Sequence, residues 1–180
     1  MRIPHDSTST KGYYGRANGL SSVPSVTLAP YVYPNNFYGT AVATAGDVNG
    51  DGYADVVFSD PGYDSGKGRV SIYLGSCNGL STTPALELVG ENTGDQFGFA
   101  VNTTGDVNGD GAADFVVGTD PTTAAPGRAY VYLGNPQVFP ANPTGENAHD
   151  YLGLAVAAGD VNGDGYTDAI IETTGEYPSP

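Results

Sequence analysis

Short runs of alternating apolar and polar residues recur along the chain, and this period of two predicts β-strands with one buried face. The clearest set begins near Tyr38 and ends near Val89. Within it we expect four strands, at residues 38–43, 54–59, 69–74 and 85–89. The dipeptide Asn78-Gly79, which is suited to positive φ, falls between the last two of them. The pattern therefore predicts a four-stranded antiparallel meander.

The same pattern occurs three times. The string DVNGDG begins at Asp47, Asp106 and Asp160, which are 59 and 54 residues apart, and GRVSIYLG from Gly68 matches GRAYVYLG from Gly127. A repeat of this length that forms one meander is typical of a propeller blade. A sandwich of two sheets would show the same alternation, but a loop at one fixed place in every repeat favours blades. We predict an all-β fold, a β-propeller built of four-stranded antiparallel blades.

The two ends of the chain match only parts of this repeat. YYGRANGLSSVPSVTL from Tyr13 aligns with YLGSCNGLSTTPALEL from Tyr73, so we expect the last two strands of a blade there, and only the first two strands of another near Ile171. The predicted organisation is a flexible tail at residues 1–10 and a propeller segment at residues 11–180, made of a half blade at 11–36, blades at 37–95 and 96–150, and a half blade at 151–180. These make three blade equivalents per chain.

Three blades are too few to close a ring, because known propellers have roughly four to eight. The open edges of half blades also invite association. We therefore expect a homodimer, in which each chain completes the half blade of the other to give a six-bladed ring with two-fold symmetry. The alternative is a fragment of a longer propeller.

The composition narrows the possible partners. Six Lys and Arg stand against twenty Asp and Glu, a net charge of −14, which argues against a nucleic-acid surface. No stretch approaches the roughly 18 apolar residues of a membrane helix, so no membrane insertion is expected. Cys77 is the only cysteine, which excludes an intrachain disulfide and a thiolate zinc site.

The three loops themselves carry the candidate chemistry. Oxygen-bearing side chains recur at loop positions 1, 3, 5 and 9, a glycine at position 6 permits a sharp turn, and position 7 can offer its backbone carbonyl. Ca²⁺ takes roughly six to eight oxygen ligands at about 2.4 Å. The predicted ligands are Asp47, Asn49, Asp51, Tyr53 and Asp55 in the first loop, Asp106, Asn108, Asp110, Ala112 and Asp114 in the second, and Asp160, Asn162, Asp164, Tyr166 and Asp168 in the third.

Other readings of the loops are weaker. An EF-hand would continue to Glu at position 12, where this chain has Phe58, Val117 and Ile171. Asx turns without a metal would explain one such loop better than three identical ones. Mg²⁺ demands a smaller and more regular shell than a nine-residue wrap of protein oxygens provides. We predict three structural Ca²⁺ per chain.

The order of Phe97-Gly98 or its counterparts, a DVNGDG loop, an apolar strand and a Gly/Asp-Pro turn resembles the FG-GAP repeats of the integrin α-subunit propeller. The resemblance covers essentially the whole chain and implies propeller blades with structural calcium in the loops. The chain departs from the family pattern at the GAP triplet, which is SDP at Ser59 to Pro61 and GTDP at Gly118 to Pro121. Integrins have seven blades, so the resemblance does not imply a partner for a six-bladed or fragmentary assembly.

Binding residues are expected in the longer loops on the face opposite the calcium loops. Tyr31, Tyr33, Tyr63 and His149 lie in these loops and could contact a protein or glycan ligand, although most tyrosines are expected to pack between blades. We expect a non-catalytic module for recognition or adhesion in an extracellular or cell-surface setting, where calcium is millimolar. The alternative is the propeller domain of a carbohydrate-active hydrolase or lyase, for which His149 is the candidate acid or base.

Overall fold

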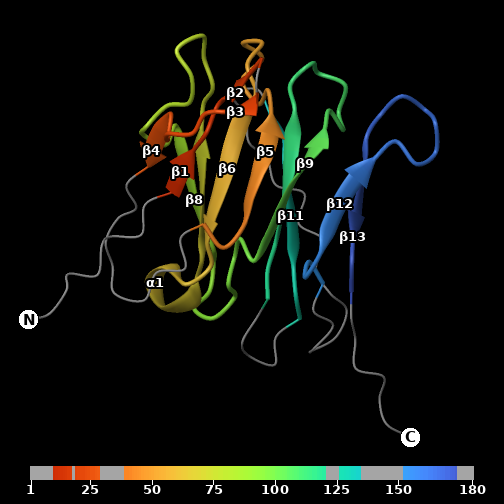
Figure 1. Ribbon diagram of the computed structural model, residues 1–180. Helices are drawn as coiled ribbons and strands as arrows, with labels where there is room; N and C mark the ends of the chain where they lie inside the picture. Colours follow the sequence, from red (N-terminus) through yellow and green to blue (C-terminus); the bar gives the residue numbers. More distant parts are fainter. Residues whose placement is uncertain (1–9, 18, 29–38, 121–125, 135–151, 174–180) are drawn as a thin grey trace, which may run out of the picture.

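The chain folds into a row of small antiparallel sheets that stand side by side, as Figure 1 shows for the computed structural model. The structure describes residues 10–17, 19–28, 39–120, 126–134 and 152–173. In these ranges the elements are β1 (Thr10–Gly12), β2 (Gly15–Arg16), β3 (Gly19–Leu20), β4 (Val26–Leu28), β5 (Val42–Gly46), β6 (Asp55–Asp60), α1 (Tyr63–Gly66), β7 (Arg69–Tyr73), β8 (Leu86–Val89), β9 (Ala100–Gly105), β10 (Asp114–Gly118), β11 (Ala129–Tyr132), β12 (Val156–Gly159) and β13 (Asp168–Ile171). The predicted predominance of β-structure is confirmed.

The first complete repeat forms one four-stranded sheet in the order β5-β6-β7-β8, as the alternation predicts. Every neighbouring pair is antiparallel, with Val57 opposite Ile72 and Ile72 opposite Leu86. The first strand was wrongly placed at residues 38–43, since it runs from Val42 to Gly46. The cause is Gly39, whose φ of 81° lies in the left-handed region and prevents extended backbone from starting there.

The other sheets repeat parts of this meander. Strands β9, β10 and β11 form a three-stranded sheet in the order β11-β10-β9, and β12 pairs with β13. The strand predicted after β11 falls outside the described residues. The sheets with β5 and β9 each contain a register shift beside the DVNGDG loop, whereas β12 pairs with β13 in continuous register. The reason is that the third repeat has one residue fewer between Gly153 and Gly159 than the first has between Gly39 and Gly46.

The N-terminal hairpin of β1 and β4 copies the pairing of β7 and β8. Gly12 lies opposite Val26, as Ile72 lies opposite Leu86, and each pair is 60 residues from its counterpart. Thr10, which the sequence prediction assigned to the tail, is the first residue of β1. Strands β2 and β3 form a short antiparallel pair within the connection between β1 and β4.

The core lies between the sheets. One face of the first complete sheet packs on the next sheet through a cluster that contains Val57, Val70, Phe115 and Tyr132. Phe97, at the start of the second repeat, is 1% exposed, and its ring meets that of Tyr130 edge to face at 5.2 Å. The other face packs on the N-terminal hairpin through Val26, Leu28, Phe58 and Tyr73. The first complete sheet is thus covered on both faces by its neighbours in the chain.

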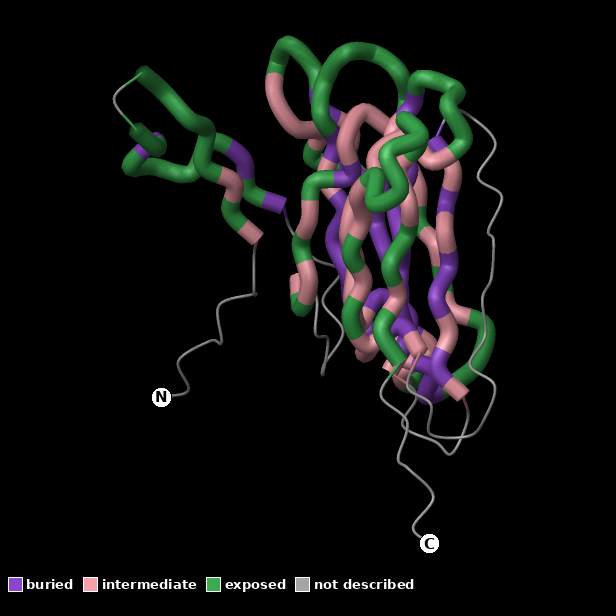
Figure 2. Tube along the Cα trace, turned by 90° about the vertical axis from the view of Figure 1, so that its right-hand side faces the viewer, coloured by how far each residue is buried: buried purple, intermediate pink, exposed green. Residues whose placement is uncertain are grey.

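The three DVNGDG loops and the turn between β7 and β8 lie at one end of the strands, and α1 lies at the other end (Figure 1). The loop end is largely exposed (Figure 2), whereas β6, β7, β10 and β11 are largely buried. The sheets therefore hold the three loops in one layer of the molecule.

Candidate metal centre

The first loop, between β5 and β6, is closed by its own polar side chains. Asp47 accepts hydrogen bonds from the backbone N–H of Asp51 at 3.0 Å and of Gly52 at 2.7 Å. Asn49 Oδ1 accepts from the same Asp51 N–H at 3.1 Å, and its amide donates to Asp51 Oδ2 at 3.0 Å. Asp51 Oδ1 accepts from the N–H of Tyr53 at 2.9 Å. Positions 1, 3 and 5 are thereby brought to one side of a single turn.

The second and third loops have the same design. In both, the first Asp accepts from the N–H of the sixth residue, at 2.8 Å for Asp106 and 3.0 Å for Asp160. The fifth residue accepts from the seventh at 2.9 Å in each. The position-6 glycines have φ of 89°, 90° and 92° along the chain, which only glycine adopts readily. One local sequence thus specifies one backbone path three times.

The ninth residue of each loop is the first residue of the following strand and has a different role. Asp55 is fully buried, and its carboxylate accepts from the N–H of Val48 at 2.9 Å and of Gly75 at 2.8 Å. Asp114 is also fully buried and accepts two equivalent bonds of 2.7 Å, the second from Gly134. This carboxylate therefore ties the loop to the end of the third strand of its sheet.

Sequence reasoning missed the glycine donors of this tie. Gly75 and Gly134 come 20 residues after the aspartates to which they donate. A signal existed, because GRVSIYLG and GRAYVYLG both end in this glycine. Its role depends on strand pairing, which brings it to the loop from 20 residues away.

Negative charge is concentrated around the ninth residue. Burial raises the pKa of Asp55, and the carboxylates of Asp51 and Asp47 raise it further, against the lowering effect of the N–H groups of Gly75 and Val48. Burial also raises the pKa of Asp114, and the carboxylates of Asp106 and Asp110 raise it further, against the lowering effect of the N–H groups of Gly134 and Val107. A cation in either loop would offset this repulsion.

The donor set of each loop fits Ca²⁺, since it offers three carboxylates, one amide oxygen and a backbone carbonyl, all hard oxygen ligands. The oxygens are not arranged as a preformed cluster. Within the described ranges, no three His, Cys, Asp or Glu side chains are grouped closely enough to hold a metal ion. The carboxylates are instead satisfied by backbone N–H groups, so binding would exchange part of these bonds for the ion.

Comparison with known proteins agrees with this repeated loop. The profile of the FG-GAP-like repeat matches residues 47–117 and again residues 106–171, which together cover more than half of the chain. The chain belongs to the FG-GAP-like repeat family. The resemblance inferred from the sequence motifs is confirmed.

The relatives of this FG-GAP-like chain include integrin α subunits. It is 42% identical to integrin alpha-6 of Gallus gallus over 86 residues, which are 47% of the chain. It is 33% identical to integrin alpha-PS3 of Drosophila melanogaster over 129 residues, or 68% of the chain. The matched regions are only 8% and 10% of the length of these two relatives.

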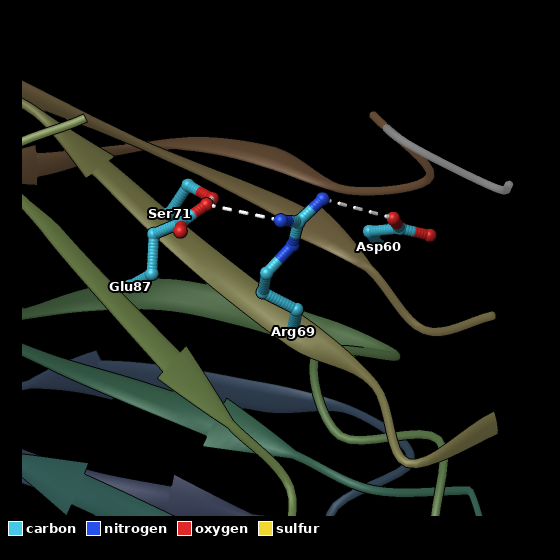
Figure 3. A network of polar contacts seen from close by, with 4 residues as sticks. All are labelled: Asp60, Arg69, Ser71 and Glu87. Carbon is cyan, nitrogen blue, oxygen red and sulfur yellow. Dashed lines mark hydrogen bonds and ion pairs between the residues drawn. The ribbon is translucent and has the colours of Figure 1, made fainter. Parts of the chain in front are cut away.

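A second cluster of charges lies where β6 ends and β7 begins. Arg69 donates to Asp60 at 3.4 Å and to Glu87 at 3.1 Å, and Ser71 lies 3.3 Å from Glu87 (Figure 3). The Arg69 guanidinium also lies 4.3 Å from the ring centroid of Tyr63. Both carboxylates face one buried guanidinium, so this cluster is a support of the sheet by ion pairs.

The predicted ligand-contacting residues are only partly described. Tyr63 belongs to α1 and packs on Arg69 as above. Tyr31, Tyr33 and His149 lie outside the described residues. In the described part of the chain, no helix is long and apolar enough to cross a membrane.

Proposed function

We propose that the chain is a calcium-binding FG-GAP propeller module for extracellular recognition or adhesion, in which calcium has a structural role. The observation that carries the proposal is the threefold occurrence of one loop with carboxylates at positions 1, 5 and 9, an amide at position 3 and the same internal hydrogen bonds. The integrin α relatives support the recognition role.

Each ion would be held by the side chains at positions 1, 3, 5 and 9 and the carbonyl at position 7 of its loop. When bound, Ca²⁺ supplies a fixed positive charge to three neighbouring carboxylates. The protein contributes the rest: Asp55 and Asp114 join the loop to the third strand, and the position-6 glycine closes the turn. Calcium would therefore stiffen the end of the sheets that holds the loops.

Recognition is assigned to the opposite end, where α1 lies beside the connection at residues 90–99. A rigid row of sheets would present this end as a surface for a protein or glycan ligand. Millimolar calcium outside cells suits sites of moderate affinity, which favours an extracellular or cell-surface location.

The calcium sites are tested by titration calorimetry on the full chain and on Asp51→Asn. Asparagine can still accept from the Tyr53 N–H but lacks the charge, so we expect the number of bound ions to fall from three to two at micromolar to millimolar calcium. Asp64→Asn is the matched control, because the Asp64 side chain is 54% exposed and lies outside the loops. Equal binding by all three proteins would contradict the assignment.

The recognition role is tested on an array of glycans and matrix proteins with and without chelator. Binding without turnover supports the proposal. Turnover of a polysaccharide that is lost in His149→Ala would contradict the proposal. That result would support the alternative, a carbohydrate-active enzyme.

A further inference from the structure

Two half sheets have complementary open edges. In the described part of the chain, β13 pairs with β12 and has no strand on its other side, and β1 pairs with β4 and has none on its other side. By position in the repeat, β12 and β13 correspond to β5 and β6, whereas β1 and β4 correspond to β7 and β8. Joined at these edges, they would reproduce the complete four-stranded sheet.

The register of that junction follows from the complete sheet. There, Val57 pairs with Ile72 and Phe58 with Ser71. The residues at these positions in the half sheets are Ile170 with Gly12 and Ile171 with Lys11. The two strands would therefore pair along their described lengths.

The third loop lacks the hydrogen bond that this junction would provide. Asp168 accepts from the Val161 N–H at 2.9 Å, but no described residue takes the place that Gly75 has beside Asp55. Gly15 occupies the position of Gly75 in the N-terminal half sheet and is exposed. Its N–H would reach Asp168 if the two edges joined.

A cavity and two exposed apolar side chains also lie at the proposed junction. A cavity of about 400 Å³ lies between the N-terminal hairpin and the first complete sheet, lined by Val26, Val42, Val56 and Phe58 among others. Val42 is 52% exposed, although Val101, its counterpart in the second repeat, packs against the core between two sheets. Ile170 is 49% exposed, although its counterpart Val57 is fully buried.

We propose that a second copy of the chain fills this cavity, with its β13 paired to β1 and its Ile170 packed on Val42, Val56 and Phe58. The contact is made twice, each copy supplying both halves, so that two copies close one ring of six blades. Two copies suffice, since six lies within the range of roughly four to eight blades in known propellers. The inference rests on the blade interpretation of the proposed function and not on calcium.

Charge favours the same pairing. Lys11 and Arg16 are two of the chain's six basic residues and are exposed on β1 and β2. Asp168 and Glu172 stand at the two ends of β13. The N-terminal hairpin is thus a basic segment of a strongly acidic chain, and it meets an acidic strand of the partner.

Light scattering after gel filtration tests the assembly on the full chain in millimolar calcium. We expect twice the chain mass of 18.4 kDa. Ile170→Asp should give a monomer with unchanged circular dichroism, whereas Val89→Asp should remain dimeric. Val89 is the matched control because it is 50% exposed on β8, away from the proposed junction. A monomeric parent chain, or an Ile170→Asp protein that stays dimeric, overturns the proposal.

A disulfide tests the register. In a Cys77→Ser background, Lys11→Cys and Ile171→Cys combined should give a covalent dimer on a non-reducing gel, because paired antiparallel strands have Cα separations of about 4.5–5.5 Å, within disulfide range. Each single variant should remain free of this dimer. Monomers only, or a ladder of longer oligomers, overturn the closed pair. Calcium binding is measured separately, so failure of the dimer is distinguishable from failure of the metal sites.

Discussion

At the scale of single residues, the ninth-position aspartates combine two roles. Asp114 is a proposed calcium ligand, and its buried carboxylate also holds the backbone N–H groups of Val107 and Gly134. The second role does not need a metal. It explains why the carboxylate remains useful to the fold although burial disfavours its charge.

We predict that Asp114→Ala destabilises the protein even in chelator. The buried Gly134 N–H and the half-buried Val107 N–H lose their acceptor. An unsatisfied buried donor costs about 1–3 kcal/mol. Urea unfolding in excess chelator measures the loss. Asp110→Ala is the control, since Asp110 is exposed and its hydrogen bonds are local, and it should cost less than about 1 kcal/mol there. Equal losses in the two variants would mean that the tie to Gly134 contributes nothing.

At the scale of elements, the glycine of the Phe97-Gly98 motif permits close contact between neighbouring sheets. A Cβ at Gly98 would lie 2.9 Å from Val70 Cγ2 and 3.0 Å from Ser59 Cβ. Gly153 occupies the same place in the third repeat, where a Cβ would lie 2.3 Å from the carbonyl oxygen of Arg128. The motif is therefore a packing device between sheets as well as a turn.

We predict that Gly98→Ala destabilises the protein by about 1–3 kcal/mol more than Gly111→Ala, because only the former adds overpacking to backbone strain. The pair is matched, since both glycines have φ of 90° and a Cβ at Gly111 would have nothing within 4 Å. Thermal and urea unfolding in chelator provide the comparison. Similar losses would assign the whole effect to φ and none to the contact between sheets.

At the scale of the whole molecule, bound calcium would reduce the net negative charge of the chain. Nine of the twenty acidic residues are loop aspartates, and three Ca²⁺ would change the net charge from −14 to −8. Without the ions these carboxylates repel one another at one end of the sheets. Stability should therefore depend on calcium.

We predict that excess chelator lowers Tm by several degrees. A site at a hundred times its Kd contributes about 2.7 kcal/mol, and 1 kcal/mol corresponds to roughly 2–4 °C in a chain of this size. Scanning calorimetry measures the shift, and Mg²⁺ at the same concentration is the control for ionic strength. An unchanged Tm would count against occupied sites.

The sequence alone was sufficient for the repeat, the β class, the antiparallel meander and the family. These depend on patterns within one repeat, where alternation, Asn-Gly turns and the loop spacing act over a few residues. The start of β5 was misplaced, because the extended pattern does not register the positive φ of Gly39. The register between β1 and β4 followed directly from the match to β7 and β8.

Only the tertiary structure decided how repeats meet. The bonds from Gly75 to Asp55 and from Gly134 to Asp114, the insertion of Phe97 between sheets and the cavity beside Val42 all join residues brought together by strand pairing and packing. Such contacts depend on the relative positions of whole sheets, which no local pattern specifies. The loops that identify the family are local in sequence, and their support comes from residues distant along the chain.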